Sequence, residues 1–231
     1  MRRLSLYILC LALLSGCQTG NVASFWDGRS VVVEDIAASE EQFAEFASAA
    51  AKALPQDALH AMDVLFDKLK EDPVDYFIYA EWMDAFYDIL SPCRSALLYG
   101  KAVERLVSDG ILTDNEYAHF QKRLEWMQFN TEGSPAMVPG CSRFEARTLV
   151  LVLNLGCPSC REALEKLGSA PEWNGVRKIA VGLGNGPQPS VSGWEYLFPE
   201  NGTSCFDIHT SPIYFVVAPD GTVEKGYTSA L

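Results

Sequence analysis

The feature that most constrains the fold is an apolar run that ends directly at a pair of cysteines. Residues 148–155 read Thr-Leu-Val-Leu-Val-Leu-Asn-Leu, and Gly-Cys-Pro-Ser-Cys follows at residues 156–160. A continuous β-prone run of this kind is typical of a strand that is covered on both faces. Residues 161–167 have a helical pattern. We therefore expect the two cysteines to lie at a strand-to-helix turn.

This position favours reactive cysteine chemistry. Cys157 is expected at the helix N-terminus, where unpaired N–H groups and the helix dipole stabilise a thiolate and lower its pKa below the usual value of about 8.5. Cys160 lies one turn later, close enough to form a disulfide, and Pro158 suits a first helical turn because it lacks an amide N–H. We expect Cys157 to attack a partner and Cys160 to resolve the mixed disulfide.

A structural zinc site is the first rival interpretation of this cysteine pair. Such a site would need another pair of ligands at short spacing, whereas Cys93, Cys141 and Cys205 each stand alone. We therefore expect neither a metal ion nor a cofactor.

Three further β-prone segments follow the motif. Residues 177–183 and 213–217 are candidate strands, and a Pro-Asp-Gly turn leads into a hairpin strand over residues 222–226. The glycine-rich stretch 182–186 precedes a proline and no helix, so we expect a loop there rather than a phosphate site. The region is expected to fold as an α/β domain.

The N-terminus has the pattern of a bacterial lipoprotein signal peptide. Two arginines precede the apolar residues 4–14, a run too short to span a bilayer of about 30 Å as a helix. Residues 14–17, Leu-Ser-Gly-Cys, resemble a lipobox, which implies removal of residues 1–16 and lipid on Cys17. An ordinary secretory signal is the alternative. No acidic run follows Gln18, so we expect a periplasm-facing lipoprotein of the inner or outer membrane.

Charge divides the mature chain into two parts. The protein has a net charge of −12, and residues 26–132 hold 21 acidic and 9 basic residues, against 9 and 7 in residues 141–231. An acidic balance argues against nucleic acid as a partner. Gly, Pro and Ser punctuate the junction. The expected division is a tether (17–38), a helical domain (39–132), a linker (133–142) and an α/β domain (143–231).

The first domain reads as a helical bundle. Capping boxes predict helices that start at Ser39, with Gln42, and at Thr113, with Glu116. Apolar spacing predicts three more helices between them, over residues 59–69, from Pro73 to about residue 90, and over residues 97–107. The third helix carries an aromatic stripe, which we interpret as core rather than as a binding site: Tyr76, Phe77, Tyr79, Trp82, Phe86 and Tyr87.

The order of motifs in the second domain resembles the thioredoxin-like fold. A Cys-X-X-Cys at a strand-to-helix turn is followed about fifty residues later by Thr-Ser-Pro, a strand and an Asp-Gly hairpin. The resemblance covers roughly residues 143–226. In this family the proline is cis and faces the cysteine pair, which implies a cis Ser211–Pro212 bond. It also implies that Ser211 and Pro212 hold a substrate strand beside Cys157.

The whole chain is similar to a Bacteroidota lipoprotein family whose N-terminal part is a domain of unknown function. The similarity rests on the lipobox, on Ser-Pro-Cys-Arg at residues 91–94 after an aromatic helix, and on the C-terminal domain. It implies a membrane-tethered thiol-disulfide oxidoreductase whose partners are protein thiols or disulfides in the periplasm.

Two features depart from the thioredoxin-like family. Many members carry a buried acidic residue six positions before the first cysteine, where it helps to move the proton of the resolving cysteine, and Leu151 occupies that position here. The proton must then pass to water or to another group, and Glu145 and Glu162 are nearby in sequence. The sequence also ends at residue 231, before the last helix of the family, so the domain is expected to lack this helix or to be completed by the first domain.

Two classes of function remain open from the sequence. The leading class is the thiol-disulfide oxidoreductase, and the alternative is a binding or scaffolding lipoprotein whose Cys157–Cys160 disulfide is structural. The remaining cysteines allow two interpretations as well. Cys141 can pair with Cys205, since both precede strands of one domain, or these two and Cys93 can be buried thiols.

Overall fold

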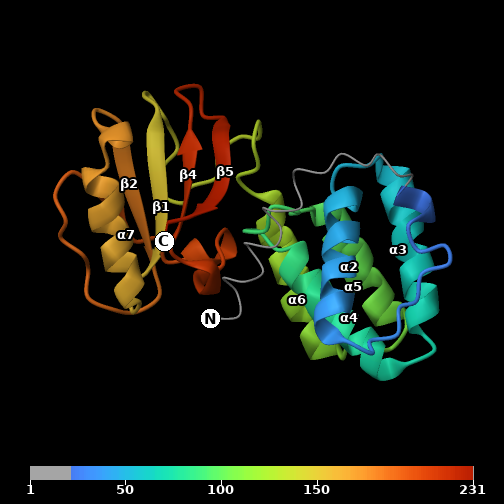
Figure 1. The fold of residues 1–231 in the computed structure, drawn as a ribbon. Helices are drawn as coiled ribbons and strands as arrows, with labels where there is room; N and C mark the ends of the chain where they lie inside the picture. Colours follow the sequence, from blue (N-terminus) through green and yellow to red (C-terminus); the bar gives the residue numbers. More distant parts are fainter. Residues whose placement is uncertain (1–21, 231) are drawn as a thin grey trace. The chain divides into compact units, whose positions relative to one another are not determined.

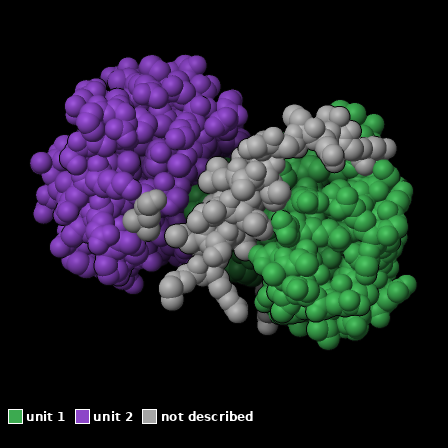
Figure 2. Space-filling model, in the orientation of Figure 1, with its two compact units in different colours: residues 1–124 green, residues 125–231 purple. Residues whose placement is uncertain are grey.

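The computed structural model describes residues 22–230, which form two compact units. The first unit extends to Leu124 and the second begins at Glu125 (Figure 2). The boundary lies inside a helix, α6 (Asp114–Gln128). The expected helical domain and the expected α/β domain are both present. Cys17 and the signal sequence lie outside the described residues.

Four helices and a short 3-10 turn, η1 (Val22–Ser24), precede α6 in the first unit. The helices are α2 (Ile36–Ala50), α3 (Pro55–Leu69), α4 (Pro73–Phe86) and α5 (Ala96–Ser108). The expected start of α2 at Ser39 is wrong, because Asp35 caps the helix by accepting hydrogen bonds from the amides of Ala37 and Ala38. The capping box of α6 is confirmed, since the carboxylate of Glu116 accepts from the amide of Thr113 at 2.9 Å.

The aromatic stripe of α4 forms the core of the helical unit. Phe43 of α2 lies at its centre, with Tyr79 and Phe86 packed edge-on against its ring at centroid distances of 5.7 and 5.5 Å. Of the six aromatic residues in the stripe only Phe77 is exposed. The interpretation of the stripe as core is therefore confirmed, with that exception. The helix itself ends at Phe86 rather than near residue 90.

Arginine side chains pair with part of the negative charge of this unit. The guanidinium of Arg105 lies 2.8 Å from Asp63 and 2.6 Å from Asp67. Arg123 of α6 lies 2.7 Å from Asp84 and 2.8 Å from Asp88. These acidic residues therefore hold helices together, in addition to solvating the surface of the bundle.

The second unit is a five-stranded mixed sheet with one long helix. Its strands are β1 (Thr148–Asn154), β2 (Arg177–Leu183), β3 (Glu195–Leu197), β4 (Ile213–Val217) and β5 (Val223–Ser229), in the order β3-β2-β1-β4-β5. The pairs β1–β2 and β2–β3 are parallel, and β4 is antiparallel to both β1 and β5. Helix α7 (Pro158–Ser169) packs along the sheet (Figure 1). The remaining turns are 3-10: η2 (Pro171–Trp173), η3 (Gly202–Ser204) and η4 (Ile208–Thr210).

The central strand β1 is buried on both faces, as its sequence predicts. Leu149, Leu151 and Leu153 lie in one apolar cluster with the inner face of α7. The partner strand β4 places Phe215 in the other direction, where its ring packs against Phe206 and Tyr227. No helix follows β5 within the residues described, which end at 230.

The segment 133–142 is part of the sheet unit rather than a separate linker. The amide of Gly133 donates to Val223 at 2.8 Å, and the amide of Val223 donates back to Ser134 at 2.8 Å. Its glycines and prolines shape a chain that pairs with the end of the β4–β5 hairpin. The residues expected as a linker are therefore hydrogen-bonded to the β4–β5 hairpin.

Candidate active site

The two cysteines of the motif lie where β1 turns into α7. Cys157 is the N-cap residue of the helix, and its amide donates to the carbonyl oxygen of Asn154 at 3.0 Å. Its own carbonyl oxygen accepts from the amide of Cys160 at 3.2 Å, so the helix begins at the motif. The helix runs from Pro158 to Ser169, longer than the expected 161–167. The expected strand-to-helix placement is present.

Cys157 is the accessible cysteine of the pair. It is half-buried, and its sulfur lies 2.9 Å from the hydroxyl oxygen of Ser159. The Ser159 hydroxyl, as a hydrogen-bond donor to the charged form, is the largest cause that lowers the pKa of the Cys157 thiol. A thiolate is the nucleophilic form of cysteine, so this environment favours attack by Cys157.

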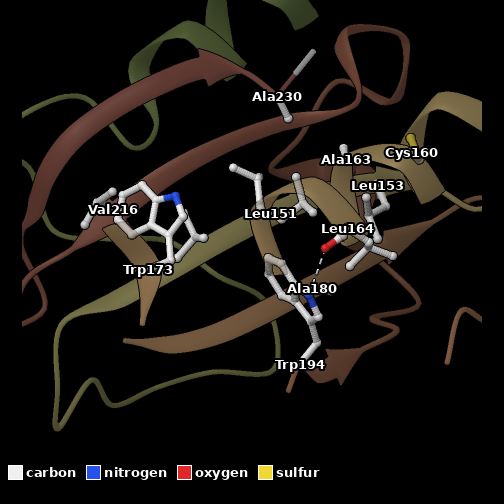
Figure 3. Packing of buried hydrophobic residues seen from close by; sticks show 12 residues of the cluster. Leu151, Leu153, Cys160, Ala163, Leu164, Trp173, Ala180, Trp194, Val216 and Ala230 are labelled. Atoms are coloured by element: carbon white, nitrogen blue, oxygen red, sulfur yellow. Dashed lines mark hydrogen bonds between the residues drawn. The ribbon is translucent and has the colours of Figure 1, made fainter. Parts of the chain in front are cut away.

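Cys160 has the opposite environment. It is 3% exposed and lies at the edge of the apolar cluster, beside Leu153 and Ala163 in Figure 3. Burial raises the pKa of its thiol to about 12. The amide of Asn154 donates to its sulfur at 3.3 Å, and this hydrogen bond acts in the opposite direction by lowering the pKa. Leu151 lies in the same cluster with no exposed surface. The residue six positions before Cys157 is therefore a fully buried apolar side chain.

Ser211 and Pro212 precede β4, and the peptide bond between them is cis, as the resemblance implies. In the antiparallel register of β1 and β4, Ile213 stands opposite Val152. Ile213 follows Pro212 directly, and Val152 lies two residues before Asn154, where the motif turn starts. Within the described residues the hydroxyl of Ser211 is buried and has no hydrogen-bond partner.

Two residues of this site were not singled out by the sequence analysis. Ser159 is a middle residue of the motif, and a hydroxyl within one helical turn of an N-cap cysteine is the signal that it can reach the sulfur. Asn154 belongs to the β-prone run 148–155, and its sequence context carries no separate signal. Its side chain accepts from the amide of Gly156, which is a turn-forming pattern of asparagine.

The other cysteines do not join this site. The thiol of Cys141 donates to the carbonyl oxygen of Arg143, and Cys205 contacts the hydroxyl of Ser204. Both are thiols in the structure, as are Cys157 and Cys160, so a pairing of Cys141 with Cys205 in the oxidised protein stays a prediction. Glu145 and Glu162 are both exposed.

Clusters of metal ligands and helices of transmembrane type are both absent from residues 22–230. This part of the chain contains no group of three or more His, Cys, Asp or Glu side chains placed to hold a metal ion. None of its helices combines the length and the apolar character that a transmembrane segment needs.

A solved structure supports the fold. The chain is similar to a crystal structure of a thioredoxin-like protein from Bacteroides caccae, with a TM-score of 0.64 and 17% sequence identity over 90% of this chain and 87% of that one. No family model and no curated protein matches the sequence. The chain is thus a helical region followed by a thioredoxin-like α/β domain. At this identity the similarity concerns the fold.

The arrangement can carry out dithiol chemistry. One cysteine is accessible and has a lowered pKa, whereas the other is covered and keeps its proton at neutral pH. Such a pair can form a mixed disulfide at the outer sulfur and then close an internal disulfide.

Proposed function

We propose that the protein is a thiol-disulfide oxidoreductase that exchanges disulfides with periplasmic proteins from a lipid anchor on Cys17. The observation that carries the proposal is the contrast between the two sulfurs. Cys157 is accessible and contacts a hydroxyl that favours the thiolate, while Cys160 is buried one turn further into the same helix. A purely structural disulfide needs no such difference between its two cysteines.

The reaction is a two-electron exchange. The Cys157 thiolate attacks one sulfur of a partner disulfide, forms a mixed disulfide and releases the other partner sulfur as a thiolate. Cys160 loses its proton and attacks Cys157, which releases the second partner thiol and leaves a Cys157–Cys160 disulfide. The partner is then reduced and this protein oxidised, and a dithiol donor must restore it. In the oxidising direction the same steps run in reverse.

A trapping experiment in membranes of the producing cell tests the proposal. In Cys160→Ser, attack by Cys157 still occurs but resolution does not, so covalent complexes with partner proteins should accumulate and dissociate on reduction. In Cys157→Ser no such complexes are expected. Cys141→Ser is the matched control, because Cys141 is a half-buried thiol of the same unit outside the motif, and it should behave as the wild type.

The scaffolding alternative predicts a different result. If neither motif variant traps partners while both remain folded, or if both trap them equally, the oxidoreductase proposal is wrong. The reduction potential of the purified full-length protein is an independent check. A structural disulfide typically lies below about −300 mV, whereas an exchange-active pair lies above it.

A further inference from the structure

Asn154, the last residue of β1, contacts both cysteines of the motif through its main chain. Its amide donates to the sulfur of Cys160 at 3.3 Å, and its carbonyl oxygen accepts from the amide of Cys157 at 3.0 Å. Both hydrogen bonds depend on one condition. The chain must turn sharply after β1, so that the first turn of α7 folds back over the end of the strand.

The side chain of Asn154 forms this turn. Its oxygen Oδ1 accepts from the amide of Gly156 at 3.0 Å, the side-chain-to-backbone pattern by which asparagine imitates a backbone turn. Asn154 is half-buried and Gly156 is exposed. Without this acceptor the Gly156 amide would turn to water, and the turn would keep only main-chain hydrogen bonds, from the amide of Leu155 to Leu183 at 2.9 Å and from that of Cys157 to Asn154 at 3.0 Å.

The loop that contains Gly184 and Gly186 packs closely against this turn. A Cβ at Gly184 would lie 3.6 Å from Oδ1 of Asn154 and 2.8 Å from Cδ1 of Ile208, so there is no space for a side chain there. A Cβ at Gly186 would lie 2.5 Å from the carbonyl oxygen of Leu155, a distance that real side chains do not adopt. The loop of Gly184 and Gly186 therefore lies directly against the turn, next to Oδ1 of Asn154 and to the carbonyl group of Leu155.

We propose that Asn154 is a positioning residue for disulfide exchange, whose side-chain oxygen fixes the turn that presents Cys157 at the helix N-terminus and brings Cys160 to the Asn154 amide. The inference rests on the proposed function. The oxygen Oδ1 of Asn154 bonds to the Gly156 amide and not to either sulfur, whereas the main chain of Asn154 contacts both cysteines. The side chain acts on the two sulfurs only through the backbone that it holds.

The test compares four full-length proteins: the wild type, Asn154→Ala, Asn154→Asp and Asn174→Ala. The alanine variant removes the acceptor for the Gly156 amide. The aspartate variant keeps an oxygen in the same place and adds a charge. Asn174 is an exposed asparagine after η2 in the same unit, so its alanine variant controls for the loss of an asparagine side chain.

The measurement is the rate of reaction of the reduced protein with a small aromatic disulfide as a function of pH, together with the reduction potential and the melting temperature. We expect Asn154→Ala to react up to about tenfold more slowly at neutral pH, a factor that corresponds to about 1.4 kcal/mol and to the upper end of what one hydrogen bond contributes. Its pH–rate midpoint should rise because Cys157 leaves the N-cap. Asn154→Asp should recover most of the rate at high pH, with a midpoint above that of the wild type.

Each outcome decides one question. If Asn154→Ala keeps the rate, midpoint and potential of the wild type, the inference is wrong and the proposed function stands. A lower melting temperature with an unchanged pH–rate midpoint would overturn it as well, because that is the effect of a merely structural residue. If the wild type itself reacts no faster than a free thiol, the proposed function fails. Should the alanine variant not fold, Asn154→Asp still decides, because it keeps the acceptor oxygen: a rate at high pH that stays about tenfold below that of the wild type would contradict the inference.

Discussion

The hydroxyl oxygen of Ser159 lies 2.9 Å from the sulfur of Cys157, and both belong to the first turn of α7. A hydrogen bond from this hydroxyl stabilises the thiolate more than the neutral thiol, because bonds to charged groups are the stronger ones. The thiolate form of Cys157 therefore depends on a neighbour inside the motif as well as on the helix N-terminus.

The first prediction concerns this contact. Ser159→Ala should raise the pKa of the Cys157 thiol, and alkylation of Cys157 at about pH 6 should slow about tenfold, since such a bond is worth about 1.5 kcal/mol. The reduction potential should fall, because the reduced form loses stabilisation. Ser159→Thr keeps the hydroxyl and should retain most of the rate. Ser169→Ala, at the other end of α7, is the control.

An unchanged alkylation profile in Ser159→Ala would contradict this prediction. The low pKa of Cys157 would then originate in the helix N-terminus alone. Ultraviolet absorbance of the thiolate, followed through a pH titration of the Cys160→Ser protein, measures the same quantity without a reagent.

The second prediction concerns the helical unit. Arg123 forms ion pairs with Asp84 of α4 and with Asp88 of the turn that follows α4. The hydroxyl of Tyr99 also donates to Asp84, at 2.9 Å. Burial raises the pKa of Asp88, and Arg123 acts against that rise. Arg123→Ala should leave two neighbouring carboxylates without their cation and lower the free energy of unfolding by about 2 kcal/mol.

Chemical denaturation of the full-length protein checks this value. Arg123→Lys should lose less, because it keeps the charge but not the planar fork that reaches both aspartates. Arg161→Ala, at an exposed position of α7, should change the stability by less than about 0.5 kcal/mol. If Arg123→Ala also changed the free energy of unfolding by less than about 0.5 kcal/mol, the ion pairs of Arg123 with Asp84 and Asp88 would contribute nothing measurable to stability.

Sequence patterns predicted the parts of the fold that depend on strong periodicity. The run at residues 148–155 predicted β1, whereas its register with β2 and β4 was not predictable, because an apolar run buried on both faces has no alternating pattern. The cis bond before Pro212 came from family resemblance and is present. The start of α2 was misplaced because Asp35 and Ser39 are both good cap residues, and only the tertiary fold directs Gln42 to Ser30.

Other features could not be predicted because they depend on residues distant in sequence. Strand β3 has three residues, too few for a periodic signal, and is defined by its pairing with β2 and by the ion pair of Arg177 with Glu195 at 2.8 Å. Residues 133–142 have the composition of a linker, yet their amides pair with residues 221–223. In the site, the two cysteines and their spacing predicted the exchange motif. The role of Asn154 was not predictable, because it depends on the hydrogen bond between its side chain and the Gly156 amide.

The third prediction concerns the anchor. Cys17 lies outside the described residues, and the lipobox-like Leu-Ser-Gly-Cys is the reason to expect lipid there. Cys17→Ser should shift the protein from the membrane fraction to the soluble periplasmic fraction, because several acyl chains are what give stable attachment. Cys10→Ser, within the apolar run of the signal, should leave the membrane fraction unchanged. A Cys17→Ser protein that stays fully in the membrane would contradict the lipid anchor.

The last prediction concerns the pH dependence of resolution. Burial raises the pKa of the Cys160 thiol to about 12, and the cluster around it is apolar, with Leu151 where an acid could accept the proton. Below that pKa the thiolate fraction, and with it the release of a partner from the mixed disulfide, should rise about tenfold per pH unit. Quenched-flow measurement from about pH 6 to 9 with a peptide mixed disulfide on Cys157 tests this. A plateau below about pH 8 would show that another group takes the proton.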